Sequence, residues 1–321
     1  MNQDLFSDSM HSFRAYGLTF SSAIRFAHVP DAEIPGEPDV RISRGEIFGP
    51  AYSPPPAIVV ESSPGKLLIR GARSATIQVS GGDRIVIEPL PGGDQGVIRQ
   101  LVLGWALGGI FHQRGMLPLH ASALCDGRDC IVFCAGSGTG KSTLAAAFLN
   151  QGFTYLDDNV ALVDLGQRVP VVVPGAPELR LWDDALPGLA FEHRVVGPIR
   201  SGFSKLSVAA REKFCEKEAP LRRVFVLRRT ADREVSFSEL AGAGKFRSLM
   251  EHVFGLRLVS DPISRGRLFQ LVSELAARVA VTAIRLPAKM PSPETLCHLI
   301  LNHELGHNDM SRAGGHSPEG G

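Results

Sequence analysis

The segment Gly136-Ser-Gly-Thr-Gly-Lys-Ser-Thr143 constrains the fold of this chain more than any other, because a glycine-rich turn followed by lysine and serine fits few structures. It follows the apolar run Cys130–Cys134 and precedes Lys141–Asn150, whose alanines and leucines favour a helix closed by Gly152. A strand, a glycine loop and a helix in this order predict an α/β fold, with the loop at the carboxyl end of a strand.

The loop has the chemistry of a phosphate site. Its glycines can adopt positive φ and turn consecutive N–H groups inward, and the following helix presents its unpaired N–H groups and positive dipole end to an anion. Lys141 is placed to reach the β- and γ-phosphates of a nucleotide, and the Ser142 hydroxyl is placed to ligate Mg²⁺. We therefore expect ATP and Mg²⁺ as cofactors. The expected nucleotide-binding residues are Ala135, Gly136, Ser137, Gly138, Thr139, Gly140, Lys141, Ser142 and Thr143. Ala135 stands where this pattern usually has its first glycine, and it adds one methyl group at the loop entrance.

Two adjacent carboxylates follow the next expected strand, Phe153–Leu156. An acid at the end of such a strand can hold Mg²⁺ directly or through water. A general base has to come within roughly 2.6–3.2 Å of the hydroxyl that it deprotonates. The pair Asp157 and Asp158 therefore predicts a division of roles, with one carboxylate near the metal and the other facing an acceptor hydroxyl.

His120 can be placed by counting along an expected hairpin. Asp126-Gly127 is a strong signal for a turn between Leu119–Leu124 and Cys130–Cys134. A two-residue turn puts His120 opposite Phe133, and a four-residue loop puts it opposite Ala135. Both registers place the imidazole at the mouth of the glycine loop, so we expect it to contact phosphate or to tune the local charge.

The first 94 residues differ in character, because short apolar runs alternate with turn residues such as Pro-Gly-Glu-Pro and Gly-Gly-Asp. Strands are expected at Ala15–Phe20, Val40–Ser43, Ala57–Glu61, Leu67–Arg70, Ala75–Val79 and Arg84–Glu88. We predict a β-rich accessory domain over residues 1–94, a P-loop domain over 95–310 and a disordered tail over 311–321.

The second domain is expected to begin with a buried helix. Asp94 is a suitable N-cap, the following residues are apolar on nearly all sides, and Arg114-Gly115 ends the helix. Further strands are expected at Leu221–Leu227 and Val279–Arg285, and further helices at Lys245–Phe254, Gly266–Arg278 and Pro293–Glu304.

Composition narrows the class of protein. A net charge of +1 over 321 residues gives no general attraction to nucleic acid or membranes. The longest uncharged apolar stretch, Leu101–Phe111, is shorter than the ~20 residues of a membrane helix, and the start lacks the apolar core of a secretory signal. The five cysteines form no CxxC pair, which favours a reducing compartment. We therefore expect a cytoplasmic protein without a nucleic-acid or membrane partner, and the number of copies in its assembly stays open.

Together these residues resemble the catalytic domain of HPr kinase/phosphorylase, a bacterial protein serine kinase with a fold related to phosphoenolpyruvate carboxykinase. The resemblance lies in His120, Gly136–Ser142, Gly152 and Asp157-Asp-Asn-Val160. It implies an α/β kinase domain of the HPr kinase C-terminal type behind a β-rich N-terminal domain. It also implies the base at Asp157, a metal-associated acid at Asp158 beside the metal ligand Ser142, and His120 next to the transferred phosphate.

The layout of the whole chain is more similar to the HPr-kinase-related proteins found with lasso-peptide biosynthesis. The sequence segments that carry this resemblance are Ala15–Phe20, Leu117–Ser122, Pro177–Trp182 and Arg222–Leu227. Such kinases phosphorylate a serine, typically the C-terminal one, of a precursor peptide, so the resemblance implies a precursor peptide as partner and substrate.

The resemblance also implies Arg180 and Lys205 as phosphate clamps. The Arg-Gly-x-Gly stretch associated with phosphorylase activity has no counterpart here, and the spacing from strand to acids is one residue shorter than in the HPr enzymes. We therefore expect neither the reverse reaction nor HPr as the substrate.

Three alternatives stay open. One is a nucleotide-gated protein that binds a peptide without phosphorylating it, and another is a small-metabolite kinase. The third is a zinc hydrolase, because His303-Glu-Leu-Gly-His307 matches a zinc-protease pattern, although Gly306 indicates a helix that is ending. Arg222 and Arg223 are further clamp candidates, and Trp182 is expected in the core or stacked on adenine.

Overall fold

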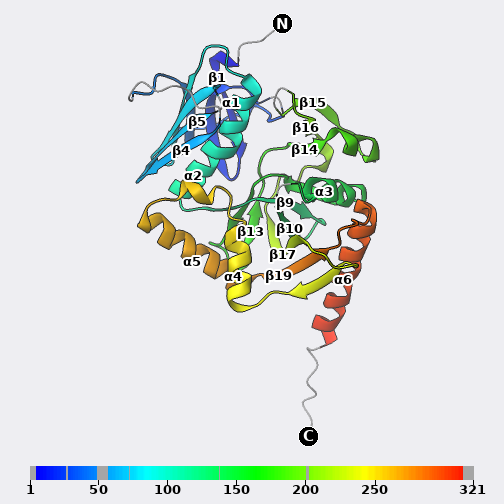
Figure 1. Cartoon of the computed structure of the whole chain (residues 1–321). Coiled ribbons are helices and arrows are strands. Elements are labelled where there is room, and N and C mark those ends of the chain that lie inside the picture. Colours follow the sequence, from blue (N-terminus) through cyan, green and yellow to red (C-terminus); the bar gives the residue numbers. More distant parts are fainter. Residues whose placement is uncertain are drawn as a thin grey trace.

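The computed structural model of the 321-residue chain describes residues 5–26, 28–48, 57–71, 73–136, 138–199 and 202–313, with all of their side chains except those of residues 8 and 305–313. Within these ranges the structure is a mixed α/β fold with sheets of seven, nine and three strands. Figure 1 shows the seven-stranded sheet with its helix at one end of the molecule and the nine-stranded sheet with the other helices at the opposite end.

The first sheet contains five of the six strands expected in residues 1–94, each within two residues of the expected bounds. Its order is β1 (Phe6–Ala15), β2 (Leu18–Ile24), β3 (Val40–Arg44), β7 (Arg84–Pro89), β6 (Ala75–Ser80), β5 (Lys66–Gly71) and β4 (Val59–Ser63). The single strand expected at Ala15–Phe20 is wrong. Tyr16 and Gly17, with φ of 56° and 69°, instead form the turn of a hairpin between β1 and β2. Positive φ at two successive residues is what a tight hairpin turn requires.

The expected buried helix is present and belongs to the core of this first sheet. It consists of α1 (Gln95–Leu101), a π-helical turn η1 (Val102–Ala106) and α2 (Leu107–Gln113). The Asp94 carboxylate caps it by accepting the Val97 N–H at 3.0 Å, as predicted. Its apolar residues pack with those of β5, β6 and β7 in one cluster. The helix therefore shares a core with the strands before it, whereas the sequence-based division placed it in the second domain.

The nine-stranded sheet forms the centre of the second half. Its order is β11 (Thr154–Asp157), β9 (Ala121–Cys125), β10 (Cys130–Ala135), β17 (Ala219–Arg229), β13 (Val171–Val173), β12 (Ala161–Asp164) and β8 (Leu117–Leu119), with β19 (Ala280–Leu286) paired to β17 and β18 (Ser236–Glu239) paired to β19. Strands β10, β17 and β19 run parallel. Every residue of β10 is buried, as expected for a strand covered on both faces.

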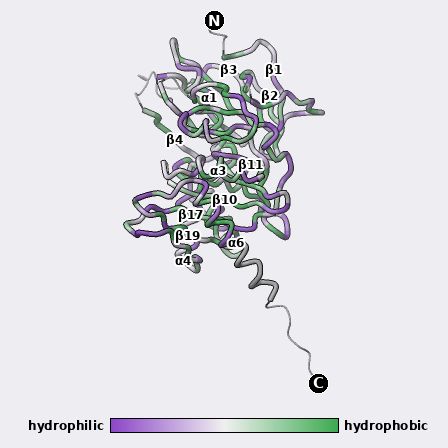
Figure 2. The backbone as a smooth tube through the Cα atoms, turned by 90° about the vertical axis from the view of Figure 1, so that its right-hand side faces the viewer, coloured by the Kyte–Doolittle hydropathy of each residue, from purple (hydrophilic) through white to green (hydrophobic). Residues whose placement is uncertain are grey.

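Helices cover both faces of this sheet. One core cluster joins its residues to α4 (Gly242–Glu251) and α5 (Pro262–Arg278), and another joins them to α3 (Lys141–Asn150) and α6 (Pro293–Ala313). In Figure 2 hydrophobic segments pass through the interior around α3, β10 and β17. No described helix is both long and apolar enough to cross a membrane.

Two parts of the second half differ from expectation. Helix α6 continues to Ala313 instead of ending at Glu304, so residues 311–313 of the expected tail are helical, and 314–321 lie outside the described residues. A separate three-stranded sheet, in the order β14 (Leu179–Trp182), β16 (Lys205–Ala209) and β15 (Arg194–Pro198), had no counterpart among the expected strands.

Candidate active site

The glycine-rich loop connects β10 to α3 as predicted. Gly138 and Gly140 have φ of 77° and 97°, in the region that favours glycine, and Ser137 lies outside the described residues. No side chain among the described residues caps α3, and its first internal bond runs from the Leu144 N–H to the Gly140 carbonyl at 2.9 Å. The N–H groups of the first helical residues therefore have no partner within the helix. This is the backbone geometry of an anion site.

The aspartate pair lies at the same sheet edge as this loop. Strand β11 is antiparallel to β9, and β9 is antiparallel to β10, so β11 and β10 run in the same direction. Their carboxyl ends consequently meet at one edge. The expected order of strand, loop, helix and acids is realised with β9 inserted between the two strands.

Asp157 is held on both carboxylate oxygens. Its Oδ1 accepts the N–H groups of Asn159 and Val160, both at 2.6 Å, and its Oδ2 accepts the Tyr16 hydroxyl at 2.8 Å. Burial raises the pKa of Asp157 to about 6, although these hydrogen bonds favour the charged form. The group is therefore mostly ionised at neutral pH.

The turn between β1 and β2 brings the N-terminal sheet onto the site. The Tyr16 N–H donates to the Pro174 carbonyl at 2.7 Å, and its hydroxyl reaches Asp157. Gly175 covers the same carboxylate so closely that a methyl group there would lie 2.0 Å from Asp157 Oδ2 and 2.7 Å from the Tyr16 ring. Sequence analysis missed both residues. Their only signals are a Tyr-Gly turn and a Pro-Gly pair, and many turns contain these.

We expect Gly175→Ala to lower the free energy of unfolding by about 1–3 kcal/mol, because the added methyl group has to displace a buried carboxylate and a tyrosine ring. Urea denaturation measures this. Gly244→Ala is the matched control, since a methyl group on that helical glycine meets nothing within 4 Å. The control is expected to be neutral or slightly stabilising. Equal unfolding curves for the two variants would contradict the tight contact at Gly175.

Asp158 is held by the protein and interacts with the charges of two lysines of the site. Its Oδ1 accepts the Ser122 hydroxyl at 2.5 Å, and its Oδ2 accepts the Arg180 backbone N–H at 3.0 Å. Burial lowers the pKa of the Lys141 and Lys205 ammonium groups, and for each lysine Asp158 is the charged neighbour that opposes this shift most. One carboxylate thus lies within electrostatic reach of two cations. Neither lysine forms an ion pair with a described residue.

The Arg180 side chain is already compensated. Its Nε lies 3.0 Å from Glu178 Oε2, and the other Glu178 oxygen accepts the Ser207 hydroxyl at 2.6 Å. These groups hold the pKa of Glu178 below its usual range despite its burial. The structure therefore brings the Arg180 backbone and the Lys205 side chain to Asp158, while the Arg180 guanidinium is paired with Glu178.

His120 lies beside the loop, in the second of the two registers considered. Cys125 pairs with Cys130 across a four-residue loop, and Ala121 pairs with Cys134, so His120 comes next to Ala135. Its Nδ1 lies 3.1 Å from the Asn159 carbonyl, and because a carbonyl only accepts, Nδ1 carries the proton.

The imidazole of His120 is neutral at neutral pH, because its pKa is low. Burial, with a smaller contribution from the charge of Lys141, lowers its pKa to about 3. The expected continuous strand at Leu119–Leu124 is interrupted at His120, whose N–H donates to the His252 carbonyl at 2.7 Å. His252 is a second histidine near the loop that sequence analysis missed, because it lies on a distant segment.

Arg222 and Arg223 are not phosphate clamps, because they lie at the far end of the sheet. Leu221 pairs with Cys130, the first residue of β10, whereas the glycine loop follows the last one. Both arginines form ion pairs with Glu304 of α6, at 3.1 and 2.7 Å. They anchor that helix to β17.

The described residues of the zinc-protease pattern, His303 and Glu304, have structural contacts. Glu304 is buried against the two arginines, and the His303 ring stacks on Phe237 at 4.3 Å. Among the described side chains, which do not include that of His307, no group of three or more His, Cys, Asp or Glu residues is placed to hold a metal ion. Trp182 is 38% exposed and contacts Phe203, so its expected core position is wrong.

Comparisons with known proteins add little to this geometry. No family model and no curated protein matches the chain. Among solved structures, the Hpr(Ser) kinase/phosphatase from Coxiella burnetii is similar with 12% sequence identity and a TM-score of 0.34, over 62% of this chain and 99% of that one. A TM-score that low does not establish a shared fold, so the proposals below rest on the residues of this chain.

Proposed function

We propose that this chain is an ATP- and Mg²⁺-dependent kinase that transfers a phosphoryl group to a serine of a precursor peptide. The observation that carries the proposal is the uncapped amino end of α3, with the buried Lys141 in its first turn and Asp158 at the same sheet edge. A buried ammonium without an ion-pair partner is costly, and a bound phosphate would compensate it. A tight binding site for an anion is the simplest reason for this arrangement.

The residues present fit a nucleotide and its metal. The loop N–H groups and Lys141 would hold the phosphates, and the Ser142 hydroxyl and Asp158 would hold Mg²⁺, which neutralises charge on the transferring group when bound. Each Asp158 oxygen accepts one hydrogen bond from the protein and keeps capacity for another partner. The donor set of hydroxyl and carboxylate oxygens suits this hard cation.

The geometry favours Asp158 over Asp157 as the carboxylate that meets the reacting groups. Asp157 has one oxygen held by two backbone N–H groups and the other covered by Tyr16 and Gly175. We therefore assign Asp157 a positioning role: it orders the turn that presents Asp158. The base assignment to Asp157, which came from the resemblance, stays a prediction.

Lys205 supports a peptide that ends in serine as the acceptor. It lies on β16 and has no ion-pair partner among the described residues. The charge of Asp158 raises the pKa of the Lys205 ammonium group, against the lowering by burial. A terminal carboxylate beside the acceptor hydroxyl would pair with this ammonium. The same cation would stabilise charge that develops on the transferring phosphoryl group.

Mass spectrometry tests the proposal directly. The protein is mixed with ATP, Mg²⁺ and short peptides ending in serine, and we expect the peptide to gain one phosphoryl group. A peptide ending in alanine and a reaction with EDTA are the controls, and both should show no gain. If calorimetry shows ATP binding while no serine peptide is ever modified, the chain is a nucleotide-gated binding protein instead.

A further inference from the structure

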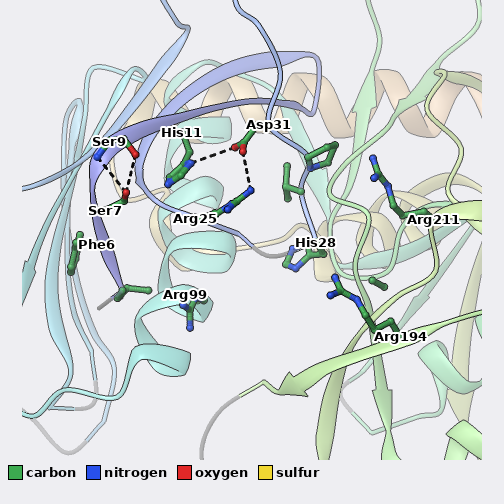
Figure 3. Close-up of a pocket in the computed structure, with 14 residues that line it drawn as sticks. Phe6, Ser7, Ser9, His11, Arg25, His28, Asp31, Arg99, Arg194 and Arg211 are labelled. Carbon is green, nitrogen blue, oxygen red and sulfur yellow. Dashed lines mark hydrogen bonds and ion pairs between the residues drawn. The ribbon is translucent and has the colours of Figure 1, made fainter. Parts of the chain in front are cut away.

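A large cleft lies between the N-terminal sheet and the three-stranded sheet. Its volume is about 930 Å³, and it is bordered by β1, by α1 and by the start of β15. Figure 3 shows Arg99 on one side of this cleft, Arg194 and Arg211 on the other, and His28 between them. The cleft is separate from the glycine loop, and the proposed phosphoryl transfer does not use it.

The charge of this cleft is strongly positive. Four arginines line it, against the single carboxylate of Asp31. Asp31 is already paired with Arg25 at 3.1 Å and with His11 at 3.5 Å. The remaining arginines, which are Arg99, Arg194 and Arg211, form no ion pair with a described residue. Burial lowers the pKa of Arg99, so an anion beside it would offset a real desolvation cost.

A buried histidine, His28, lies where the cleft meets the interior. His28 is only 9% exposed, and its Nε2 has no hydrogen-bond partner among the described residues. Its other ring nitrogen lies 3.9 Å from Glu178. Because Nε2 is itself closed to solvent and burial lowers the pKa of His28, the imidazole forms a neutral part of the cleft wall and does not present this nitrogen to a ligand.

The same histidine connects the cleft to the candidate active site. A second cavity, of about 290 Å³, shares His28 and Arg99 with the first and continues to Glu178 and Arg180. The Arg180 backbone N–H holds Asp158 at 3.0 Å. A ligand that fills both cavities would therefore reach Arg180, the residue whose backbone holds Asp158.

The strands at the cleft suit an extended peptide. β1 is the edge of the seven-stranded sheet and β15 is the edge of the three-stranded sheet, so no described strand pairs with either outer side. At one point the edge of β1 is occupied, because the Ala32 N–H donates to the Ser12 carbonyl at 2.7 Å. Nearer the start of β1, Phe6, Ser7 and Ser9 line the cleft. An exposed strand edge can add a peptide through main-chain hydrogen bonds, which a free phosphate could not use.

We propose that this cleft binds an acidic segment of the polypeptide whose serine is phosphorylated, with the segment lying along β1 and its carboxylates on Arg99, Arg194 and Arg211. The inference deepens the proposed function and rests on it for the identity of the polypeptide. It defines the substrate class as a peptide with Asp or Glu residues some distance from the acceptor serine.

Fluorescence anisotropy without nucleotide tests the cleft separately from the chemistry. The probes are three labelled peptides of equal length that alternate Ser and Gly with Glu, with Gln or with Lys. The test variant is Arg194→Glu/Arg211→Glu, in which both side chains are exposed. The control, Arg128→Glu/Arg229→Glu, changes the net charge equally at exposed positions outside the cleft.

We expect the Glu peptide to bind at least about tenfold more tightly than the other two, with an affinity that falls as salt rises. The test variant should lose about tenfold or more of this affinity, and the control should keep it within about twofold. Equal binding of the Glu and Gln peptides, or equal losses in the two variants, would overturn the proposal. An RNA oligonucleotide that binds more tightly than the Glu peptide and is lost in the test variant would assign the cleft to nucleic acid instead.

The outcome is independent of the kinase test. If the Glu peptide binds at the cleft but no peptide is phosphorylated, the proposed kinase function is wrong and the cleft is still a binding site for acidic peptides. If the Glu and Gln peptides are phosphorylated with equal KM, the proposed role of the cleft is wrong and the kinase function stands.

Discussion

Replacement of Lys141 by methionine is expected to lower the rate of phosphoryl transfer by about 10²–10³-fold, the usual effect of removing one preorganised electrostatic contact to a transition state. Lys141 is the first residue of α3 and is 9% exposed, so its ammonium lies at the amino end of the helix where the phosphates would bind. Methionine keeps most of the length and the apolar stem of the side chain and removes only the charge. Steady-state kinetics with ATP and a serine-ending peptide measures the loss.

The stability of this variant separates a chemical defect from a folding defect. Burial lowers the pKa of Lys141, which shows that the charged form is disfavoured in the fold. Removing this charge should therefore leave the free energy of unfolding unchanged or raise it. Lys66→Met, at an exposed position of β5, is the control and should change neither rate nor stability. A Lys141→Met protein that retains activity within about threefold would remove the central support for the kinase.

The local parts of the site were predictable because their signals are local. The loop, α3 and the two aspartates lie within 25 residues of sequence, and glycine spacing, helix propensity and strand length specify them together. The N-cap at Asp94 was predictable for the same reason, since one carboxylate satisfies a backbone group three residues away.

The hairpin at His120 shows where local reasoning reaches its limit. The Asp126-Gly127 pair favours a two-residue turn, yet the structure has a four-residue loop. The Asp126 Oδ1 accepts the N–H groups of Arg128 and Asp129, both at 2.9 Å, and these bonds stabilise the longer loop. Both turn geometries are compatible with the sequence, so only the pairing partners of β9 decide between them.

The long-range parts of the site could not be predicted. Tyr16 and Asp157 are 141 residues apart, and no residue pattern near either one indicates their hydrogen bond. The short strands β14, β15 and β16 pair only with one another, and sequence analysis expected no strand in these segments. Arg222 and Arg223 were clamp candidates because of their charge. No residue pattern near them indicates that they pair with Glu304, which is about 80 residues away in the sequence.

Asp158→Asn is expected to reduce the rate at saturating ATP and peptide by about 10²-fold or more, and Asp157→Asn by about tenfold or less. Asp158 is the acidic group that most strongly favours the charged forms of Lys141 and Lys205, so its charge is the one that we expect to meet the metal or the acceptor hydroxyl. Asparagine at 157 keeps an oxygen that can accept the N–H groups of Asn159 and Val160, so the turn that presents Asp158 survives.

The two aspartate variants form a matched pair, because each exchanges one oxygen for nitrogen in a buried carboxylate of the same turn. The urea unfolding curve of each variant shows whether a loss of rate comes from the fold. If Asp157→Asn is inactive and stably folded while Asp158→Asn keeps most of its rate, the proton is taken by Asp157. The hydrogen bonds that now hold Asp157 would then have to rearrange when substrate binds, since both of its oxygens are engaged without it.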